Sequence, residues 1–460
     1  MPFANPVLLR VEVRANLRLA LPLIAAQIAG IGMGAVDTVF AGRLGPRALA
    51  AVAMGFNLNV VFFISFMGLM MACSPIVAQM SGAGRELGDI AVFVRRARRF
   101  ALLVATLWLV GLNLVAVPVL SHLGLDDETV RLSVRFVRLL SFSAYGMSLW
   151  FAQRFCAEGL GQTRPIVVAG LVGLAANAAL DWLLLFPHPA LNAWGLPLLG
   201  VPGCGVATTL SSLLMAALLA RQFRHAPVLR RLMASPPPAV APAEGTADIL
   251  RLGLPIGLIM LAEAGLFVTV ALLVARFGDL AVAAYQVAIN FAALAFMIPV
   301  GLSLATTVRV GHAVGAGDNN AARLRGNVGM GLGLINAASN SLIMLLLGRW
   351  IAGLYTNDPA IAAQAAHFLY LAAVFQFFDA LQVTASGALR GFKDTRWPAL
   401  ITVIAYWLVG LPVAWWLAFD AGLGADGLWW GLTAGLGCAA FGLSLRYRWA
   451  LATRDTLHSA

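Results

Sequence analysis

The sequence predicts an all-α integral membrane protein, with about twelve transmembrane helices in two six-helix lobes related by a pseudo-twofold axis along the membrane normal. Three observations predict this fold class. Of the 460 residues, 61% are hydrophobic and only 11% are charged, which is too little charge for a soluble chain of this length. The uncharged residues form runs of about 20, the length that a helix needs to cross the hydrocarbon core. The third observation is an internal duplication.

The first half of the chain recurs in the second half at a constant spacing of 233 residues, without gaps. Leu17-Arg-Leu-Ala-Leu-Pro22 returns as Leu250-Arg-Leu-Gly-Leu-Pro255, and Gly82-Ala-Gly84 returns as Gly315-Ala-Gly317. Arg43 likewise corresponds to Arg276. Two copies of one membrane bundle are typical of a transporter, and less so of a receptor or an enzyme.

The hydropathy of the chain predicts six spans in each half. In the first half they lie near residues 17–41, 49–76, 93–120, 130–157, 165–187 and 203–222. In the second half they lie near residues 250–276, 281–308, 325–347, 361–389, 397–419 and 425–449. Because six is an even number, both copies enter the membrane in the same direction, and their symmetry axis is expected along the membrane normal.

Three domains follow from these spans: an N-terminal six-helix lobe at 1–222, a linker at 223–249 and a C-terminal six-helix lobe at 250–460. The linker is predicted because the stretch from Ser235 to Ala247 is rich in Pro and Ala and has no apolar period.

The basic residues are concentrated in alternate loops of this chain, whose net charge is +11. One such loop holds Arg224 and Arg230, whereas the intervening loops carry acids such as Asp126 and Asp358. The positive-inside rule therefore places the basic loops, the linker and both termini in the cytoplasm. Arg43 and its neighbour Arg47 are exceptions on an outer loop. No basic patch is interleaved with stacking aromatic residues, so nucleic acid is not an expected partner.

Four acidic residues lie within predicted spans, namely Asp37, Asp181, Glu263 and Asp379. Ionisable groups in lipid are costly and normally face a cavity or a partner. None of the four has a Lys or Arg within one helical turn. We expect them to bind a proton, a metal cation or a cationic substrate; the alternative is interhelical hydrogen bonding by a protonated or solvated carboxyl. The duplication does not carry these acids, because Asp37 corresponds to Val270, so the two lobes are expected to be specialised.

Polar residues accompany these acids at helical spacing. Gln376, Asp379 and Gln382 share one helix face, and Asn177 shares one with Asp181. Gln286 and Asn290 are also four residues apart on the eighth span. Such groups could supply oxygen ligands to a hard monovalent cation, or hydrogen bonds between helices.

An apolar substrate cavity is expected around the second-half acids. Its predicted lining is Gln286, Asn290, Tyr285, Phe267, Phe291, Phe375, Gln376 and Met260. Aromatic and methionine side chains beside carboxylates suit lipophilic cations, through dispersion and cation–π attraction. The alternative is that these residues fill the core or face lipid.

Enzyme motifs are weak in this sequence. The glycine-rich stretch from Gly311 to Gly317 is not followed by the Lys-Ser/Thr of a phosphate-binding loop, and the histidines lack HExxH spacing. We therefore expect no catalytic residues and no cofactor other than a coupling ion.

Several stretches together resemble one known family. They are Gly34-Ala-Val-Asp-Thr-Val-Phe-Ala-Gly42, Ala262-Glu-Ala-Gly-Leu-Phe267, Ala283-Ala-Tyr-Gln-Val-Ala-Ile-Asn-Phe291, Arg309-Val-Gly-His312, Phe375-Gln-Phe-Phe-Asp379 and Ala388-Leu-Arg-Gly-Phe-Lys-Asp394. The sequence resembles the multidrug and toxic compound extrusion (MATE) transporters, and within them the NorM-like branch, from about residue 15 to 450.

The resemblance implies an antiporter of the bacterial inner membrane that works by alternating access. Such a protein would act as a monomer and export lipophilic or cationic compounds in exchange for Na+ or H+. By this resemblance Glu263 and Asp379 form the second-lobe cation site, which would hold Na+ if Na+ is the coupling ion. Asp37 is the first-lobe acid, and Asn177 lies close to it. Asp181, where NorM-like proteins often have Asn, is more like the DinF-type branch.

Tyr285 stands where relatives commonly have His, so a proton role at that position does not carry over. An alternative function is a lipid-linked oligosaccharide flippase of the same broader superfamily. A flippase would need a cavity rich in Arg or Lys to hold pyrophosphate, whereas these spans hold acids and almost no bases.

Overall fold

The computed structural model describes residues 6–124, 126–186, 199–236, 238 and 242–459, with the backbone alone for residues 455–459. Within these residues the chain is helical and contains no strand, which confirms the all-α prediction. The helices of the first half are α1 (Pro6–Arg43), α2 (Pro46–Met71), α3 (Cys73–Gly82), α4 (Leu87–Ser121), α5 (Asp127–Leu140), α6 (Ser143–Gly159), α7 (Arg164–Leu185), α9 (Val201–His225) and α10 (Pro227–Ala234).

The second half begins with α11 (Thr246–Val274) and the short 3-10 turn η2 (Ala275–Phe277). It continues with α12 (Asp279–Gly315), α13 (Asn319–Tyr355), α14 (Pro359–Gly391), α15 (Arg396–Val403), η3 (Ile404–Gly410), α16 (Leu411–Trp415), η4 (Trp416–Asp420) and α17 (Ala425–Ser459). The segments η3 and η4 are π-helical, so the eleventh predicted span is one continuous helix with two wider stretches.

Eleven helical segments of the described chain are long and apolar enough to cross a membrane. They match eleven of the predicted spans, except that residue 187 of the fifth lies outside the described residues. The remaining span, 130–157, is divided between α5 and α6. At the break Ser141 Oγ donates to the carbonyl of Arg138 (2.7 Å) and accepts from Asn113 Nδ2 (2.9 Å). Such local side-chain bonds compete with the helix ladder, which hydropathy alone does not reveal.

The helices form two compact units. One comprises Met1–Ile24, Ala78–Gly84 and Leu258–Ala460, and the other comprises Ala25–Val77 and Arg85–Gly257. The lobe boundaries at 1–222 and 250–460 stay a prediction. The predicted linker 223–249 contains α10, which buries Leu229 and Leu232, and its residues 237 and 239–241 lie outside the described residues.

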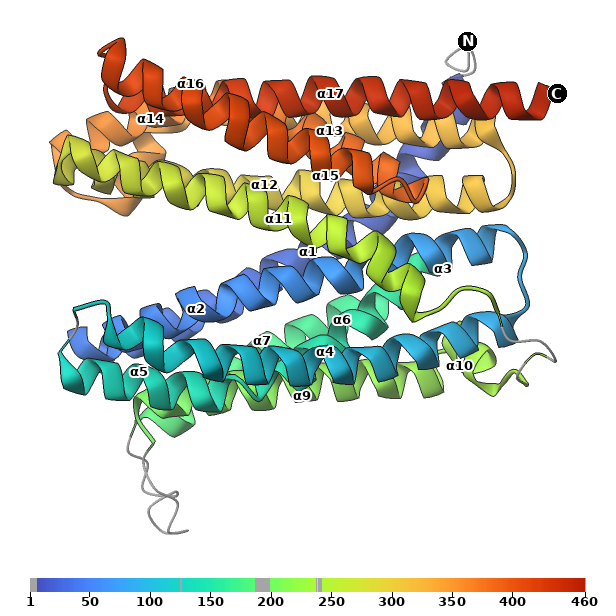
Figure 1. The fold of residues 1–460 in the computed structure, drawn as a ribbon, viewed down its shortest axis with the longest axis horizontal. Helices are drawn as coiled ribbons and strands as arrows, with labels where there is room; N and C mark the ends of the chain where they lie inside the picture. The colour runs from blue at the N-terminus through green and yellow to red at the C-terminus, as the bar shows by residue number, and fades with distance from the viewer. Residues whose placement is uncertain (1–5, 125, 187–198, 237, 239–241, 460) are drawn as a thin grey trace. The chain divides into compact units, whose positions relative to one another are not determined.

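In the unit that holds most of the second half, α12, α13, α14 and α17 pack against one another (Figure 1). Small residues at their crossings allow this close approach. A Cβ at Gly387 of α14 would clash with Ser303 of α12, and one at Gly329 of α13 would clash with Thr306. The buried residues of this unit include many alanines and a few large aromatic residues, such as Phe368 and Trp429.

In the other unit, α9 packs against α5, α6 and α7, and α4 packs against α6. The same small-residue chemistry holds these helices together. A Cβ at Gly146 of α6 would clash with Ser212 of α9, and one at Gly205 of α9 would lie 2.8 Å from the carbonyl oxygen of Phe136 on α5.

The duplication is visible in the packing as well as in the sequence. Gly82 lies against the backbone of His312, and Gly315 lies against the backbone of Gln79. Gly82 and Gly315 are counterparts at the 233-residue spacing, and so are Gln79 and His312. Each copy therefore supplies the glycine for one contact and the opposing backbone for the other.

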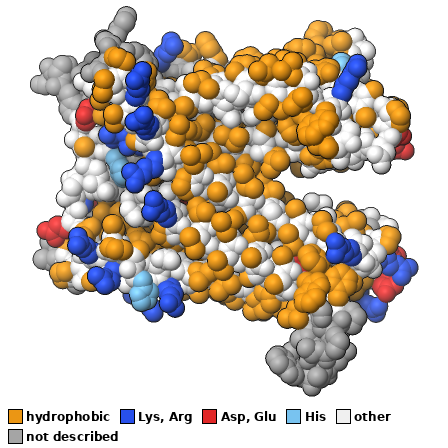
Figure 2. All heavy atoms as spheres, turned by 180° about the vertical axis from the view of Figure 1, so that it is seen from behind, with side chains coloured by type: hydrophobic (Ala, Val, Ile, Leu, Met, Phe, Trp, Pro, Cys, Tyr) orange, Lys and Arg blue, Asp and Glu red, His pale blue; other side chains and the backbone are white. Residues whose placement is uncertain are grey.

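The surface of the molecule is that of a membrane protein. In Figure 2, hydrophobic side chains cover the flanks of the helices, and Lys and Arg side chains lie mostly toward the helix ends. Leu254, Leu272 and Leu346 are examples of large apolar side chains that are mainly exposed. Their exposure indicates a lipid-facing surface.

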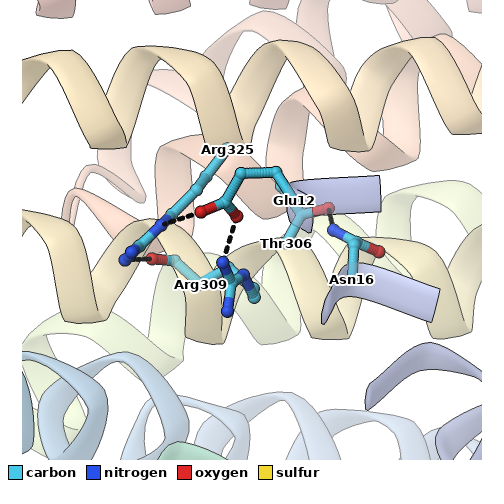
Figure 3. A network of polar contacts seen from close by, with 5 residues as sticks. All are labelled: Glu12, Asn16, Thr306, Arg309 and Arg325. Carbon is cyan, nitrogen blue, oxygen red and sulfur yellow. Dashed lines mark hydrogen bonds and ion pairs between the residues drawn. The ribbon is translucent and has the colours of Figure 1, made fainter. Parts of the chain in front are cut away.

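A polar network fastens the start of α1 to α12 and α13 within one unit (Figure 3). The carboxylate of Glu12 accepts a bond from Arg309 Nη2 and lies 3.5 Å from Arg325 Nε. Arg325 Nη1 also donates to the carbonyl of Arg309 (3.0 Å), and Asn16 Nδ2 donates to Thr306 Oγ1 (3.3 Å). One carboxylate therefore compensates two guanidinium groups.

Candidate functional site

Two predicted acids meet within the second-half unit. Glu263 lies midway along α11 and is partly buried, and Asp379 lies on α14 and is buried. The two carboxyl groups interact electrostatically. The π-helical segment η3 lies directly beside Glu263, because Trp407 Nε1 donates to the carbonyl of Ala262 (3.3 Å). Gly265, three residues after Ala262 on α11, faces the ring of Trp407.

Several polar atoms around these carboxyl groups lack hydrogen-bond partners among the described residues. They are both amide atoms of Gln376, Oδ1 of Asp379, Oε1 of Gln382 and the hydroxyl group of Tyr406. All four side chains are buried. Buried polar atoms are rarely left unsatisfied, so such a group is suited to a bound cation, a polar ligand or ordered water.

Tyr406 of η3 is a member of this site that the sequence did not reveal. It is fully buried, and it interacts electrostatically with both Glu263 and Asp379. π-helical turns are frequently found at functional sites. The only sequence signal was one hydroxyl group within an apolar run, and such a residue is usually part of the core.

A basic side chain also reaches the site. No Lys or Arg lies within a helical turn of Glu263 along the chain, but the fold brings Arg390 of α14 into electrostatic range of it. Arg390 is buried, and its Nη2 donates to Ser303 Oγ (2.6 Å). Glu263 therefore interacts electrostatically with one carboxyl group and one guanidinium group, both supplied by α14.

A second polar site lies in the other unit around Asp37 of α1. Asn177 Nδ2 of α7 donates to Asp37 Oδ1 (2.9 Å), and Thr208 Oγ1 of α9 donates to Asp37 Oδ2 (2.8 Å). The structure thus places Asn177 against Asp37, as the resemblance implied. Thr208 was missed, because one threonine on a separate helix carries no spacing signal.

Asp181 belongs to the same site and is fully buried. Its carboxyl interacts directly with that of Asp37, yet neither of its oxygens receives a donor from the described residues. Two ionised carboxylates have no hydrogen between them, whereas one shared proton would satisfy both. This pair is therefore suited to holding a proton.

The predicted cavity residues divide into two sets. Tyr285 and Phe375 are buried with Trp429, whose ring centre lies 5.4 Å and 5.8 Å from theirs. The others, Phe267, Phe291 and Met260, are partly buried. Gln286 and Asn290 are exposed, and Asn290 Nδ2 donates to the carbonyl of Gln286 (2.7 Å). The structure therefore does not bring this pair into the buried polar cluster around Asp379.

A protein-family model named MatE matches residues 22–183 and again residues 255–416. The two matched segments are equally long and begin 233 residues apart, which is the spacing of the duplication. The chain belongs to the MatE family.

Curated MatE relatives match nearly the whole chain. Multidrug resistance protein PmpM of Pseudomonas aeruginosa is 38% identical over 456 residues, which cover 97% of this chain and 93% of that protein. Multidrug resistance protein NorM of Vibrio vulnificus is 34% identical over 450 residues, which cover 97% of each chain.

Solved MATE structures share the fold. The structure of MATE in the bent conformation aligns with a TM-score of 0.87 at 20% identity and covers 98% of each chain. The eukaryotic MATE transporter AtDTX14 aligns with a TM-score of 0.81 at 21% identity and covers 97% of this chain and 98% of that one.

Proposed function

We propose that this MatE protein is a multidrug efflux antiporter that exports lipophilic or cationic compounds in exchange for Na+ or H+ by alternating access. The observation that carries the proposal is the pair Glu263 and Asp379, which lies within two helices long and apolar enough to cross a membrane and among unpartnered buried oxygens. The names of the relatives PmpM and NorM support multidrug resistance as the physiological outcome.

In this mechanism the coupling cation and the cargo use the same negative charge in turn. Glu263 and Asp379 bind Na+ or H+ while the site faces outward, and the cation lowers the affinity for cationic cargo, which then leaves. Tyr285 and Phe375, with the partly buried Phe267, Phe291 and Met260, supply apolar contact to the cargo. Gln376 lies beside the acids and orients polar groups of the cargo. Gln286 and Asn290 would contact it from the exposed face of α12.

The site around Asp37 is proposed as a second coupling element. Asp37, Asn177 and Asp181 would hold a proton or a cation, because two adjoining carboxyl groups tolerate only one negative charge between them. The two halves of the protein would then share a scaffold but differ in the ion that each can hold.

The remaining features of the proposal concern the cell. We place the protein in the bacterial inner membrane as a functional monomer, with the arginine-rich loops and both termini in the cytoplasm. It requires no cofactor besides the coupling ion, and its activity is transport and not catalysis.

Ethidium efflux from cells tests the proposal. Glu263→Gln and Asp379→Asn should each abolish energised efflux at unchanged protein level, because the neutral side chains cannot exchange one cation for another. Asp279→Asn is the matched control, since Asp279 is an exposed acid in the first turn of α12. Normal efflux by both site variants would refute the site, and loss of efflux by the control would show that the assay does not report on it.

A further inference from the structure

An arginine ends the first membrane helix of each copy. Arg43 is the last residue of α1, and its counterpart Arg276 lies in η2, which directly follows α11. In both copies a glycine with positive φ follows two residues later, Gly45 (115°) and Gly278 (93°), and the next helix starts there. Both arginines are exposed. Arginine on the non-cytoplasmic side opposes the usual distribution of charge, so its presence in both copies needs a physical reason.

Both arginines lie over aromatic rings: Arg276 lies over two rings near the end of the fifth span of its copy, whereas Arg43 lies over Phe40 of its own helix α1, which contacts the residue after the fifth span. Arg276 Cζ lies 5.4 Å from the ring centre of Trp415 and 5.6 Å from that of Phe419. Arg43 Cζ lies 5.6 Å from the ring centre of Phe40, which is 6.1 Å from the ring of Phe186.

The duplication includes the aromatic residues of the fifth span but not Phe40, whose counterpart is Leu273. Phe186 and Phe419 are counterparts at the 233-residue spacing, as are Trp182 and Trp415. The rings of Trp415 and Phe419 are in contact (4.7 Å between centres), whereas Phe186 directly follows the end of α7. Trp182 is 52% exposed and Trp415 is 43% exposed. Exposed tryptophan near the end of a membrane helix is typical of the lipid headgroup region.

A guanidinium group that lies over a ring still has the N–H groups of its edge available. Its cation–π attraction holds the plane of the group, while the edge can donate two parallel hydrogen bonds to a phosphate. No ion pair of the described residues includes Arg43 or Arg276. The positive charge is therefore oriented but not neutralised by a carboxylate, at the depth where lipid phosphates lie.

We propose that Arg43 and Arg276, each with its adjoining aromatic residues, bind the phosphate of one phospholipid in the leaflet opposite the arginine-rich loops. The glycerol and acyl portions of that lipid would lie along Trp182 in one copy and Trp415 in the other. A soluble phosphate would gain nothing from these lipid-facing rings, so the occupant is a membrane lipid. The site does not depend on transport, and it explains why the duplication retains an outer arginine.

Native mass spectrometry of the intact protein, titrated with phosphatidylglycerol, tests the proposal. The wild type should retain two phosphatidylglycerol molecules in preference to further ones. Arg43→Gln and Arg276→Gln should each lose one, with affinity for that lipid reduced about tenfold or more, because charged hydrogen bonds to phosphate are lost. The double variant should lose both, and inorganic phosphate should not displace either.

Arg47→Gln is the matched control. Arg47 lies four residues after Arg43, in the first turn of α2, and is also exposed, but it pairs with Glu128 (2.7 Å). This variant removes the same charge without touching the aromatic sites, so both lipids should be retained. Equal retention by the double variant and the wild type would overturn the proposal. So would equal loss in Arg47→Gln, which would indicate unspecific attraction to positive charge. Displacement by inorganic phosphate would show that the occupant is not a lipid.

Discussion

The ion-pair network at the start of α1 allows a quantitative prediction for Glu12→Gln. Glutamine keeps the length of the side chain and one oxygen acceptor, so the substitution removes the negative charge and little else. The side chains of Glu12, Arg309 and Arg325 are only 11%, 18% and 22% exposed. Without the carboxylate, two mostly buried guanidinium groups lose their acidic partner (Figure 3).

The expected cost follows from this burial. Breaking a buried ion pair by removing one partner costs about 3–5 kcal/mol, because the remaining charge is left uncompensated. Some solvent still reaches both arginines, and the Arg325 contact is the longer one at 3.5 Å. We therefore expect the low end, a loss of about 3 kcal/mol in the free energy of unfolding.

Reversible unfolding in mixed detergent micelles measures this loss, and Glu128→Gln is the matched control. Glu128 pairs with Arg47 at 2.7 Å, but those side chains are 49% and 67% exposed. An exposed pair contributes about 0–1 kcal/mol, so this variant should stay close to the wild type. If both variants lose the same free energy, burial does not decide the strength of these ion pairs and the reasoning is wrong.

Three further predictions concern single side chains. Tyr406→Phe should weaken the affinity for the coupling cation about tenfold, measured by cation titration of efflux in proteoliposomes, because the hydroxyl group beside both acids is lost. Tyr285→Phe is the control, because it removes another buried and unpartnered hydroxyl group, and it should leave the affinity for the cation unchanged. If both variants weaken the affinity equally, Tyr406 has no specific role. Gly82→Ala should abolish the folded-protein peak on size-exclusion chromatography, because the added Cβ would clash with the backbone of His312. Gly34→Ala is the control and should give a normal profile, because no atom lies within 4 Å of a Cβ at that position. A normal profile for Gly82→Ala as well would contradict the packing around Gly82. Asp37→Asn should lower the free energy of unfolding by about 1–3 kcal/mol, measured in mixed micelles, because the amide nitrogen that replaces one carboxylate oxygen cannot accept the hydrogen bond made there. Unchanged stability would contradict the network.

The membrane spans and the acids could be predicted from the sequence because both are local signals. A run of about 20 apolar residues specifies a helix that can cross the membrane, wherever that helix later packs. A carboxyl within such a run stands out because its burial is costly. Asp37, Glu263 and Asp379 could therefore be identified without knowledge of their neighbours.

The partners of these acids could not be predicted, because they come from other helices. Thr208 and Tyr406 are brought to the acids by tertiary packing, and so is Arg390, which is more than two helical turns from Asp379 along its own helix. Helical spacing identifies residues that share a face, but it does not show which face is buried. Gln286 and Asn290 illustrate this limit, since they share a face of α12 and that face is exposed.

The fourth span was predicted as one helix, because its interruption between α5 and α6 is too short to show in the hydropathy. Hydropathy averages over about twenty residues, whereas the break extends over only two residues, Ser141 and Phe142. Ser141 bonds to the backbone of its own helix and to Asn113 of α4. Only the second of these contacts is specific to the fold.

Competition between cation and cargo in the purified protein tests whether both use Glu263 and Asp379. Fluorescence of bound ethidium is followed while Na+ is raised at fixed pH, and in a parallel titration while the pH is lowered without Na+. We predict that at least one of the two cations releases ethidium from the wild type, and that Glu263→Gln with Asp379→Asn removes this release. Retention of ethidium by the wild type in both titrations, or unchanged release in the double variant, would contradict this prediction.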